Sequence, residues 1–417
     1  MKTTLIILVA AIVLASSAVL ATDTRVLTMG DNNMILLDDA NVHLFPSRVL
    51  EYPNLAVGEF GGDSFHRLGI HWKFGSTNPW VMATYFSTSA IGGPTGYYNS
   101  SPFGYFTEGL SSTDERIDLY YGRGNMIGGH NFGFHFGYSR ASYDIDEANT
   151  DGDYQEKITY YDFGFGLTDT AGSYDASLHL GFGGWDDEGL DGAGDGVVQS
   201  EPDGFMDVTA MFRKFRQINP EWTAIGHATL FFGKRGEKDH GADAFGPDWT
   251  TTDDIITKDG RFFFDIGLGT NWMPAGNVLV VGDVGIAYDK VKREFTTSAN
   301  HPAGAGSAEW TTTDVVFPYW SIGFDADVFK WMDVRMGATS DWISQKSETG
   351  SVIALTETEK TKWAENMTYL GFGFHWGRLH VDTETDPDLF LRGFDFITGN
   401  GGGSDMNGRI SVVYELM

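Results

Sequence analysis

Residues 132–138 read Phe-Gly-Phe-His-Phe-Gly-Tyr, so that bulky aromatic side chains alternate with small or polar ones. Residues 161–167, Tyr-Asp-Phe-Gly-Phe-Gly-Leu, repeat this design. Successive side chains of a β-strand point to opposite faces, and alternation with a period of two therefore gives one apolar face and one small or polar face. The pattern returns from about residue 64 to the C-terminus, for example at 68–74, 177–182 and 370–376. The chain is predicted to be all-β.

The lengths of the connections between these segments favour a membrane barrel. A soluble β-protein would bury the aromatic face, whereas a transmembrane barrel turns it to lipid and encloses the polar face around a lumen. Short turns at one rim and long loops at the other are typical of such barrels. Short connections, at 75–78, 123–129, 168–172, 217–220, 273–276 and 330, alternate with long ones at 88–114, 144–157, 185–203, 236–260, 298–314, 345–363 and 385–408.

The number of strands follows from counting the segments. With the weaker segments at 55–61 and 379–384 the count is about 16, and an even count allows the barrel to close. The alternation around Val81 and Ile225 is ambiguous, which leaves 14 strands as the alternative. The predicted fold is a transmembrane antiparallel β-barrel of about 16 strands.

Two further features are typical of outer-membrane barrels. Tryptophans lie within a few residues of the short turns and would form one interfacial girdle: Trp72, Trp80, Trp222, Trp272, Trp331 and Trp376. Residues 410–416 alternate as the terminal strand of such barrels does, although the chain ends in Met417 where an aromatic residue is usual.

The N-terminus predicts export. Lys2 precedes an apolar run at 5–15, and small residues lead to Ala21, as in a cleaved secretory signal peptide. The run is shorter than the roughly 20 residues of a membrane-spanning helix. We therefore expect a signal peptide at 1–21, an N-terminal segment at 22–53 without sustained alternation, and a barrel at 54–417. In a barrel protein, the segment at 22–53 belongs either in the periplasm or inside the lumen.

Composition restricts the partners. The chain has 57 acidic and 28 basic residues, a formal charge of −29, and no cysteine. Such a charge argues against nucleic acid or anionic lipid as a partner and makes cations the natural counter-ions. Without cysteine there is neither a disulfide framework nor the lipidated cysteine of a bacterial lipoprotein.

The alternation also predicts which ionisable side chains face the lumen, because a charge on the lipid face is costly. Two interpretations of this set remain open: a pore lining that prefers cations because of its aspartates, and a salt-bridge network that fills the lumen. The set comprises Arg67, His71, Lys73, Arg116, Asp118, His135, Asp162, Asp175, His179, Asp207, Arg213, Asp265, Asp283, Asp325, Asp327, Asp333, Arg335, His375 and Asp382.

The long connections carry much of the negative charge. Residues 147–152, Glu-Ala-Asn-Thr-Asp-Gly, partly match the spacing of a calcium-binding loop, with Glu147, Asn149 and Asp151 as candidate ligands. Ile158 stands where such a loop has its final acidic ligand. A calcium ion on these extracellular loops and a plain solvated acidic surface are the two alternatives.

The N-terminal segment resembles the start of the FadL and PorV superfamily of outer-membrane barrels. The resemblance rests on 25–30, Arg-Val-Leu-Thr-Met-Gly, on 37–41, Leu-Asp-Asp-Ala-Asn, and on 45–47, Phe-Pro-Ser. The chain departs from the family pattern at Thr28, Phe45 and Arg48. The resemblance implies a hatch folded into a barrel of about 14 strands, with Asp38, Asp39 and Asn41 as hatch residues. It also implies either uptake of hydrophobic compounds or, in the PorV branch, a part in secretion.

Enzyme signatures are missing from the sequence. It contains no G-x-S-x-G, no H-E-x-x-H and no P-loop motif, and no cofactor is expected. We expect an outer-membrane porin or uptake channel that passes small solutes or hydrophobic compounds, in contact with outer-membrane lipid and with oligomerisation left open. The alternatives are a PorV-like secretion or scaffold protein and a barrel hydrolase.

Overall fold

The computed structural model describes residues 23–61, 66–75, 79–88, 115–146, 153–190, 197–240, 254–297, 306–350, 357–385 and 408–416. The expected signal peptide at 1–21 and the candidate calcium ligands Glu147, Asn149 and Asp151 lie outside these ranges. Within the described residues, no helix has the length and apolar character needed to cross a membrane.

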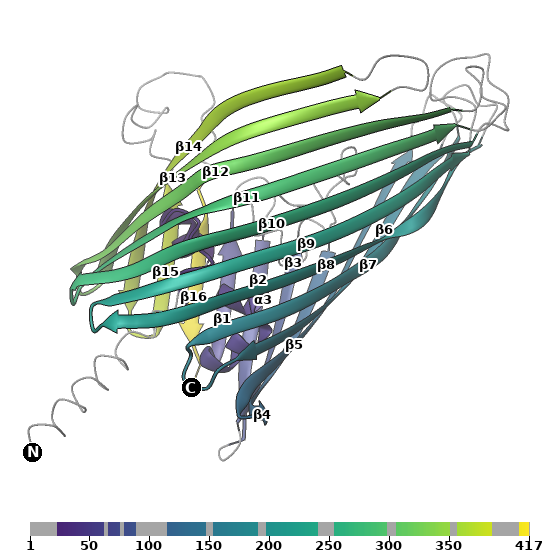
Figure 1. The fold of residues 1–417 in the computed structure, drawn as a ribbon. Helices are drawn as coiled ribbons and strands as arrows, with labels where there is room; N and C mark the ends of the chain where they lie inside the picture. Colours follow the sequence, from purple (N-terminus) through teal and green to yellow (C-terminus); the bar gives the residue numbers. More distant parts are fainter. Residues whose placement is uncertain are drawn as a thin grey trace, which may run out of the picture.

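Sixteen antiparallel strands close into one barrel, in which every strand pairs with its neighbours in the chain and β1 pairs with β16 (Figure 1). The prediction of 16 strands is confirmed and the alternative of 14 is wrong. The strands are β1 (Leu55–Phe60), β2 (His66–Phe74), β3 (Trp80–Thr88), β4 (Glu115–Ile127), β5 (His130–Asp146), β6 (Asp153–Thr168), β7 (Tyr174–Leu190), β8 (Val197–Asn219), β9 (Trp222–His240), β10 (Asp254–Ala275), β11 (Val278–Thr297), β12 (Gly306–Phe329), β13 (Met332–Gly350), β14 (Glu357–Trp376), β15 (Leu379–Thr385) and β16 (Ile410–Glu415).

The outer surface of the barrel carries large apolar side chains. Leu268 in β10 is 70% exposed and Phe86 in β3 is 55% exposed, whereas the alternate positions face inward and are buried. In β5, for example, Phe134 is partly exposed and the next residue, His135, is 1% exposed. Apolar side chains outside and polar ones inside form the surface that a transmembrane barrel presents to lipid and to its lumen.

Several strands continue far into stretches that the sequence predicts to be long loops. About half of the expected loop at 298–314 is strand, because β12 begins at Gly306. In this extension Lys292 and Glu309 pair at 3.1 Å, with side chains 40% and 54% exposed. Both faces of such a hairpin meet water, so backbone pairing continues without apolar alternation. The other expected loops at 144–157, 185–203, 236–260 and 345–363 are shortened in the same way.

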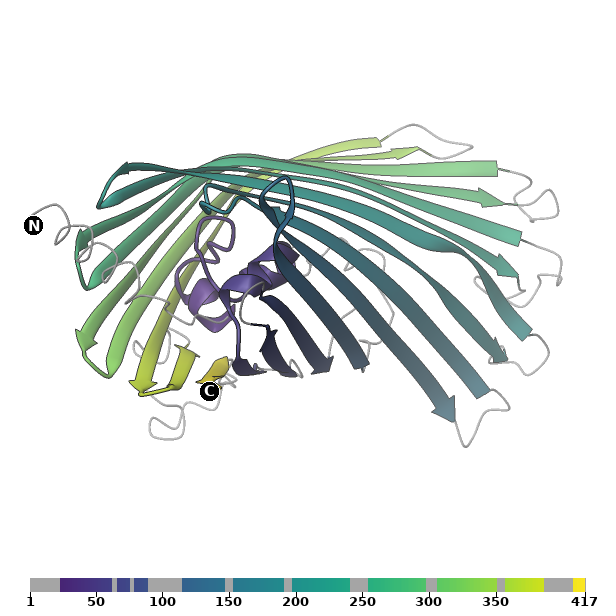
Figure 2. The ribbon, with the colours of Figure 1, turned by 90° about the horizontal axis from the view of Figure 1, so that it is seen from below.

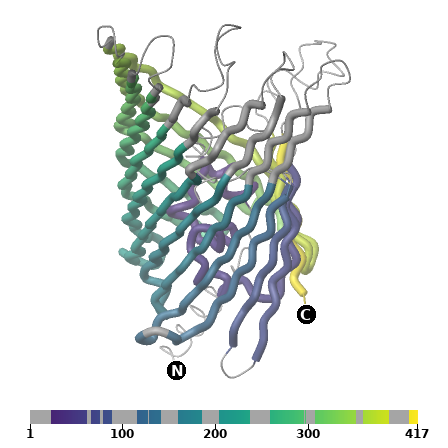
Figure 3. Tube along the Cα trace, turned by 90° about the vertical axis from the view of Figure 1, so that its right-hand side faces the viewer, coloured from purple at the N-terminus to yellow at the C-terminus, as the bar shows by residue number. Residues whose placement is uncertain are grey.

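The barrel wall is consequently uneven in height. Strand β12 has 24 residues and β8 has 23, whereas β1 and β16 have 6 each. Figures 1 and 3 show the long strands reaching well past the short ones at one end of the barrel. The short strands β15, β16, β1, β2 and β3 are consecutive in the sheet and form one low wall.

Residues 23–53, here called the luminal segment, lie inside the barrel (Figure 2). They form α2 (Asp23–Thr28), α3 (Asn41–Leu44) and the 3₁₀ helix η1 (Pro46–Glu51), and nearly all of them are buried. Val81 in β3 and Ile225 in β9, each 1% exposed, pack inward in apolar clusters that include Val42 and Leu36 of the segment. Their strands therefore have two apolar faces, which explains the ambiguous alternation.

Glycines on the inner wall let the backbone of the luminal segment approach closely. A Cβ atom added to Gly133 in β5 would lie 2.0 Å from the backbone nitrogen of Ser47. One added to Gly337 in β13 would lie 2.3 Å from the backbone nitrogen of Gly30. A side chain at either position would clash with backbone, so these glycines are required for seating the segment.

Candidate functional site

Arg213 of β8 is the main anchor of the luminal segment. Its side chain is fully buried and donates hydrogen bonds to the carbonyl oxygen of Leu36 at 2.9 Å and to Oδ1 of Asn41 at 2.9 Å. Its Nε also lies 2.7 Å from Oδ2 of Asp175 on β7. The guanidinium thus satisfies acceptors in the segment while its charge is balanced by a buried carboxylate.

Three further ion pairs join the segment to the wall. Arg48 donates to both carboxylate oxygens of Asp175, at 2.9 and 2.8 Å. Arg25 pairs with Asp325 on β12 at 3.0 Å, and Asp23 pairs with Arg67 on β2 at 3.0 Å. Charged groups removed from water are tolerated only when they are paired, so these contacts define one seated position for the segment.

The expected hatch residues hold the fold of the segment itself. Asp38 Oδ1 accepts from the Ala40 backbone at 3.1 Å, and Asn41 Oδ1 accepts from the Asp38 backbone at 3.0 Å. Burial raises the pKa of Asp38 to about 6. Burial and the neighbouring Asp38 charge raise the pKa of Asp39 well above its ordinary value.

The remaining candidate residues fall into three groups. His71 and His179 contact the segment through the carbonyl oxygens of Tyr52 and Leu44, at 2.6 and 3.1 Å. Lys73 and Asp327 are exposed and lie close to the short turns. The others make polar contacts within the wall. One cluster contains Arg116, Asp118, His135 and Asp162, and a second contains Asp325, Asp333, Arg335, His375 and Asp382. Asp265 and Asp283 contact His227, and Asp207 accepts from Tyr160.

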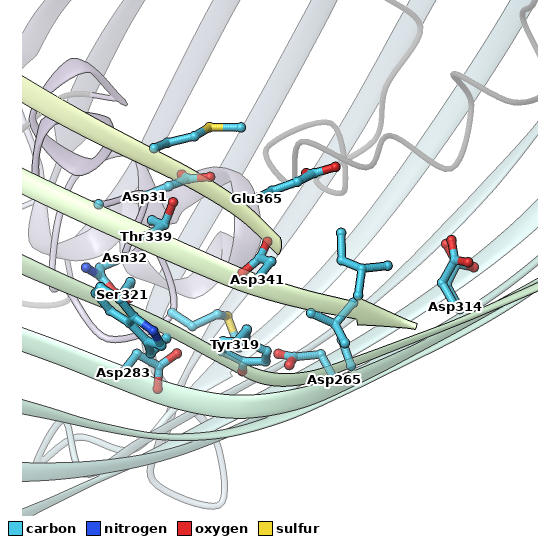
Figure 4. A pocket seen from close by; sticks show the side chains of 18 of the residues that line it. Asp31, Asn32, Asp265, Asp283, Asp314, Tyr319, Ser321, Thr339, Asp341 and Glu365 are labelled. Atoms are coloured by element: carbon cyan, nitrogen blue, oxygen red, sulfur yellow. The ribbon is translucent and has the colours of Figure 1, made fainter. Parts of the chain in front are cut away.

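A cavity of about 450 Å³ lies between the luminal segment and strands β9 to β14. Residues 30–35 of the segment form one side of it. Figure 4 shows the carboxylates of the wall and of the segment around this space. Its acidic lining residues are Asp31, Asp265, Asp283, Asp289, Asp314, Asp341 and Glu365, and its aromatic ones are Phe263, Tyr319, Trp320, Trp363 and Tyr369.

The acidic groups of the cavity are only partly neutralised. Asp283 and Asp265 lie 2.9 and 3.4 Å from the two ring nitrogens of His227, and Asp289 accepts from Arg261 at 2.9 Å. Buried Oδ1 atoms of Asp265, Asp283 and Asp314 have no hydrogen-bond partner among the described residues. The cavity, called here the acidic cavity, therefore offers acceptors and negative charge to a cation.

Asp31 belongs to the segment side of the acidic cavity. Its backbone adopts a left-handed conformation with φ of 54°, which turns the chain at the end of α2. Burial raises the pKa of Asp31 to about 7, against the attraction of Arg409. The charge on this side of the cavity consequently changes near neutral pH.

Sequence reasoning named Asp265 and Asp283 but missed the other acidic residues of the cavity. Asp289 shares a face of β11 with Asp283, because the two are an even number of residues apart. Asp314 falls in the expected loop at 298–314, and Asp341 lies in a stretch where the apolar alternation is weak, so the period of two places neither of them on the lumen side. Extending the period of two along each strand identifies Asp289 from Asp283.

No family model matches the chain, and no curated protein sequence matches it significantly. Among solved structures it is similar to the ferric yersiniabactin uptake receptor FyuA from Yersinia pestis, with 9% identity, a TM-score of 0.37, and coverage of 86% of this chain and 79% of that one. The ferric-catecholate import receptor Fiu from E. coli K12 is 8% identical, with a TM-score of 0.35 and coverage of 86% of this chain and 80% of that one. The outer membrane protease OmpT from Escherichia coli is 8% identical, with a TM-score of 0.24 and coverage of 67% of this chain and 93% of that one.

Proposed function

We propose that this protein is an uptake channel of the bacterial outer membrane and that the acidic cavity binds small organic cations on their way through it. The observation that carries the proposal is the convergence of seven carboxyl groups and the aromatic side chains of Phe263, Tyr319, Trp363 and Tyr369 on one space inside a closed barrel. The chain would thus act in transport and not in catalysis.

The outer surface supports the membrane location. Exposed apolar side chains occur all around the barrel, including Leu68 at 55%, Leu268 at 70% and Met336 at 55%. Near the short turns, Trp222 stacks on Trp272 with ring centroids 6.0 Å apart, as expected at a membrane interface. Pairing of β1 with β16 closes the sheet, so that every strand has a neighbour on both sides, as a barrel in lipid requires.

The chemistry of the acidic cavity selects for a cation that has an apolar part. Carboxylates in a partly enclosed space concentrate negative potential and raise the local concentration of cations. Aromatic faces attract a cation through their quadrupole and also cover the apolar surface of a ligand. A wholly hydrophobic compound would leave the carboxylates without partners, so the cavity suits it poorly.

The luminal segment would act as a gated plug in this channel. Its ion pairs with Asp175, Asp325 and Arg67 hold it in the lumen, and it borders the acidic cavity. A solute bound in the cavity contacts residues 30–35 and can thereby influence how the segment is seated.

The experiment compares two charge-removing variants of the refolded full-length protein. Asp314→Asn with Asp341→Asn removes two cavity carboxylates on β12 and β13, whereas Glu309→Gln with Glu348→Gln removes two exposed ones from the same strands. Binding of benzyltrimethylammonium should weaken about tenfold or more in the first variant, because a lost contact to a charged group costs roughly 1.5–3 kcal/mol.

The control variant should bind this cation as the wild type does, and uncharged benzyl alcohol should bind weakly to all three proteins. Equal binding of benzyltrimethylammonium to the wild type and to the cavity variant would contradict the proposed site.

A second candidate function is favoured by the filled lumen. A PorV-like secretion or scaffold protein has no need of an open path, and the buried anchor Arg213 fixes the segment firmly. This alternative predicts partner proteins that co-purify with the barrel and no uptake of cations into liposomes that contain it.

A further inference from the structure

Two histidines and an aspartate come together on the inner wall away from the acidic cavity. His135 on β5 pairs in register with Gly164 on β6, which pairs with His179 on β7. Asp162 lies two residues from Gly164 on the same face of β6. A Cβ atom at Gly164 would be 2.6 Å from Cε1 of His179 and 2.9 Å from Cβ of His135, so the glycine leaves room for both rings.

The three side chains direct potential ligand atoms at one another. Nδ1 of His135 lies 3.6 Å from Oδ2 of Asp162, and Nδ1 of His179 lies 3.9 Å from Oδ1. One ligand atom from each of the three residues lies within 4.8 Å of the others. Each side chain is 1% exposed, so the group is closed off from bulk solvent.

These atoms are also unsatisfied. Nδ1 of His135, Nδ1 of His179 and Oδ1 of Asp162 are buried and have no hydrogen-bond partner within the part of the chain that the structure describes. Buried polar atoms in proteins are nearly always paired, and three unpaired atoms that converge on one point indicate a missing ligand.

The opposite ring nitrogens are held in the way that metal-binding histidines require. Nε2 of His135 lies 2.8 Å from Oδ1 of Asp118, and Nε2 of His179 lies 3.1 Å from the carbonyl oxygen of Leu44. Because a carboxylate and a carbonyl only accept, the neutral ring of each histidine has its hydrogen on Nε2 and its lone pair on Nδ1. Such partners orient a histidine and increase its basicity as a ligand.

We propose that His135, His179 and Asp162 bind one divalent transition-metal ion, for which Zn²⁺ is the best match. Imidazole nitrogen with a carboxylate oxygen is a common zinc donor set. Ligands about 2.0–2.1 Å from a tetrahedral ion are roughly 3.3 Å apart. The histidine-to-carboxylate separations of 3.6 and 3.9 Å are near this value, and the whole group, whose ligand atoms lie within 4.8 Å of one another, would close around the ion on binding. A fourth position is left for water.

The proposed ion would reinforce the seat of the luminal segment. It bridges β5, β6 and β7, and His179 connects it directly to the backbone of Leu44 in α3. None of the three ligands lines the acidic cavity, so this assignment is independent of the proposed cation uptake.

The test is a Co²⁺ titration of the refolded full-length protein, followed by visible absorption and by competition with Zn²⁺. The wild type should bind one Co²⁺ per chain with the intense absorption of a tetrahedral site, and Zn²⁺ should displace it. The double variant His135→Ala with His179→Ala should lose this signal. Asp118→Asn, which keeps all three ligands and changes a group that partners both His135 and Arg116, should weaken binding about 10–100-fold.

The matched control is His71→Ala, because His71 is a fully buried histidine on β2 whose two nitrogens already have partners, Tyr52 and Tyr85. It should keep the wild-type signal. Circular dichroism identifies the folded fraction of each variant, and Zn²⁺ should raise the melting temperature of the wild type and of His71→Ala but not of the double variant. A folded wild type that binds neither ion, or equal binding by the double variant, would overturn the assignment.

Discussion

At the scale of single residues, the charged groups that join the luminal segment to the wall have defined partners. Arg213 contacts three parts of the molecule at once: the backbone at Leu36, the side chain of Asn41, and Asp175 on the wall. Its inward position follows from the alternation of β8. Its partners in the luminal segment did not follow from the sequence, because Leu36 and Asn41 lie 177 and 172 residues away.

Replacing Arg213 with methionine should loosen the luminal segment. The change keeps an apolar stem but leaves the acceptors at 33–41 without their donor, and breaking a buried ion pair costs about 3–5 kcal/mol. Hydrogen exchange of the backbone amides at 33–41 should accelerate strongly. The control is Arg216→Met, which changes an exposed residue of the same strand and should leave the exchange at 33–41 nearly as in the wild type. Unchanged exchange in Arg213→Met would contradict the anchoring role.

The pKa of Asp31 predicts a pH dependence for cation binding. Burial raises this pKa from 3.8 to about 7, so the folded protein keeps a proton that the unfolded chain releases near pH 4. The contribution of Asp31 to stability is present at low pH and is lost as the pH rises through about 7. The negative charge that can bind a cation appears over the same rise.

Affinity for benzyltrimethylammonium, whose charge does not vary with pH, should accordingly increase between pH 6 and pH 8. Asp31→Asn should reduce this increase, and asparagine tolerates the left-handed backbone at this position. Isothermal titration at several pH values measures the effect. A pH profile that is identical in both proteins would show that Asp31 does not take part.

At the scale of elements, the alternation of the sequence predicted strands correctly where one face is apolar and the other polar. It did not locate the parts of strands in which neither face, or both faces, are apolar. The alternation at 132–138 located β5, but not its continuation to Asp146. Hairpins outside the membrane need only backbone pairing, so β7 to β14 are longer than expected. On β3 the inner residue Val81 is apolar because the segment covers it, and no local pattern can reveal a partner from elsewhere in the chain.

Glycines on the inner face provide a test of how strands and segment fit. Gly337→Val places a side chain against the backbone of residues 28–30 and should displace the segment, with faster proteolysis of 23–53. Gly260→Val is the control, because a Cβ atom at that position on β10 meets nothing within 4 Å. Equal protease resistance in the two variants would argue against a tightly seated segment.

At the scale of the whole molecule, closure, count and direction of the strands could be derived from the sequence because they repeat along it. The contents of the lumen could not, since they depend on contacts between residues 23–53 and strands from β1 to β16. The resemblance of the segment to the FadL and PorV superfamily gave the expectation of a hatch. The acidic cavity is a property of the assembled barrel, because six strands and the segment each supply part of its lining.

The measurement that tests the account most directly is the conductance of the protein in a planar bilayer, with and without residues 23–53. The full-length protein should be nearly silent, because the anchored segment fills the lumen. The shortened protein should conduct steadily and should select for cations, since the inner wall keeps the carboxylates of β10 to β14. Equal conductance of the two proteins, or a preference of the shortened one for anions, would contradict a plugged, cation-selective uptake channel.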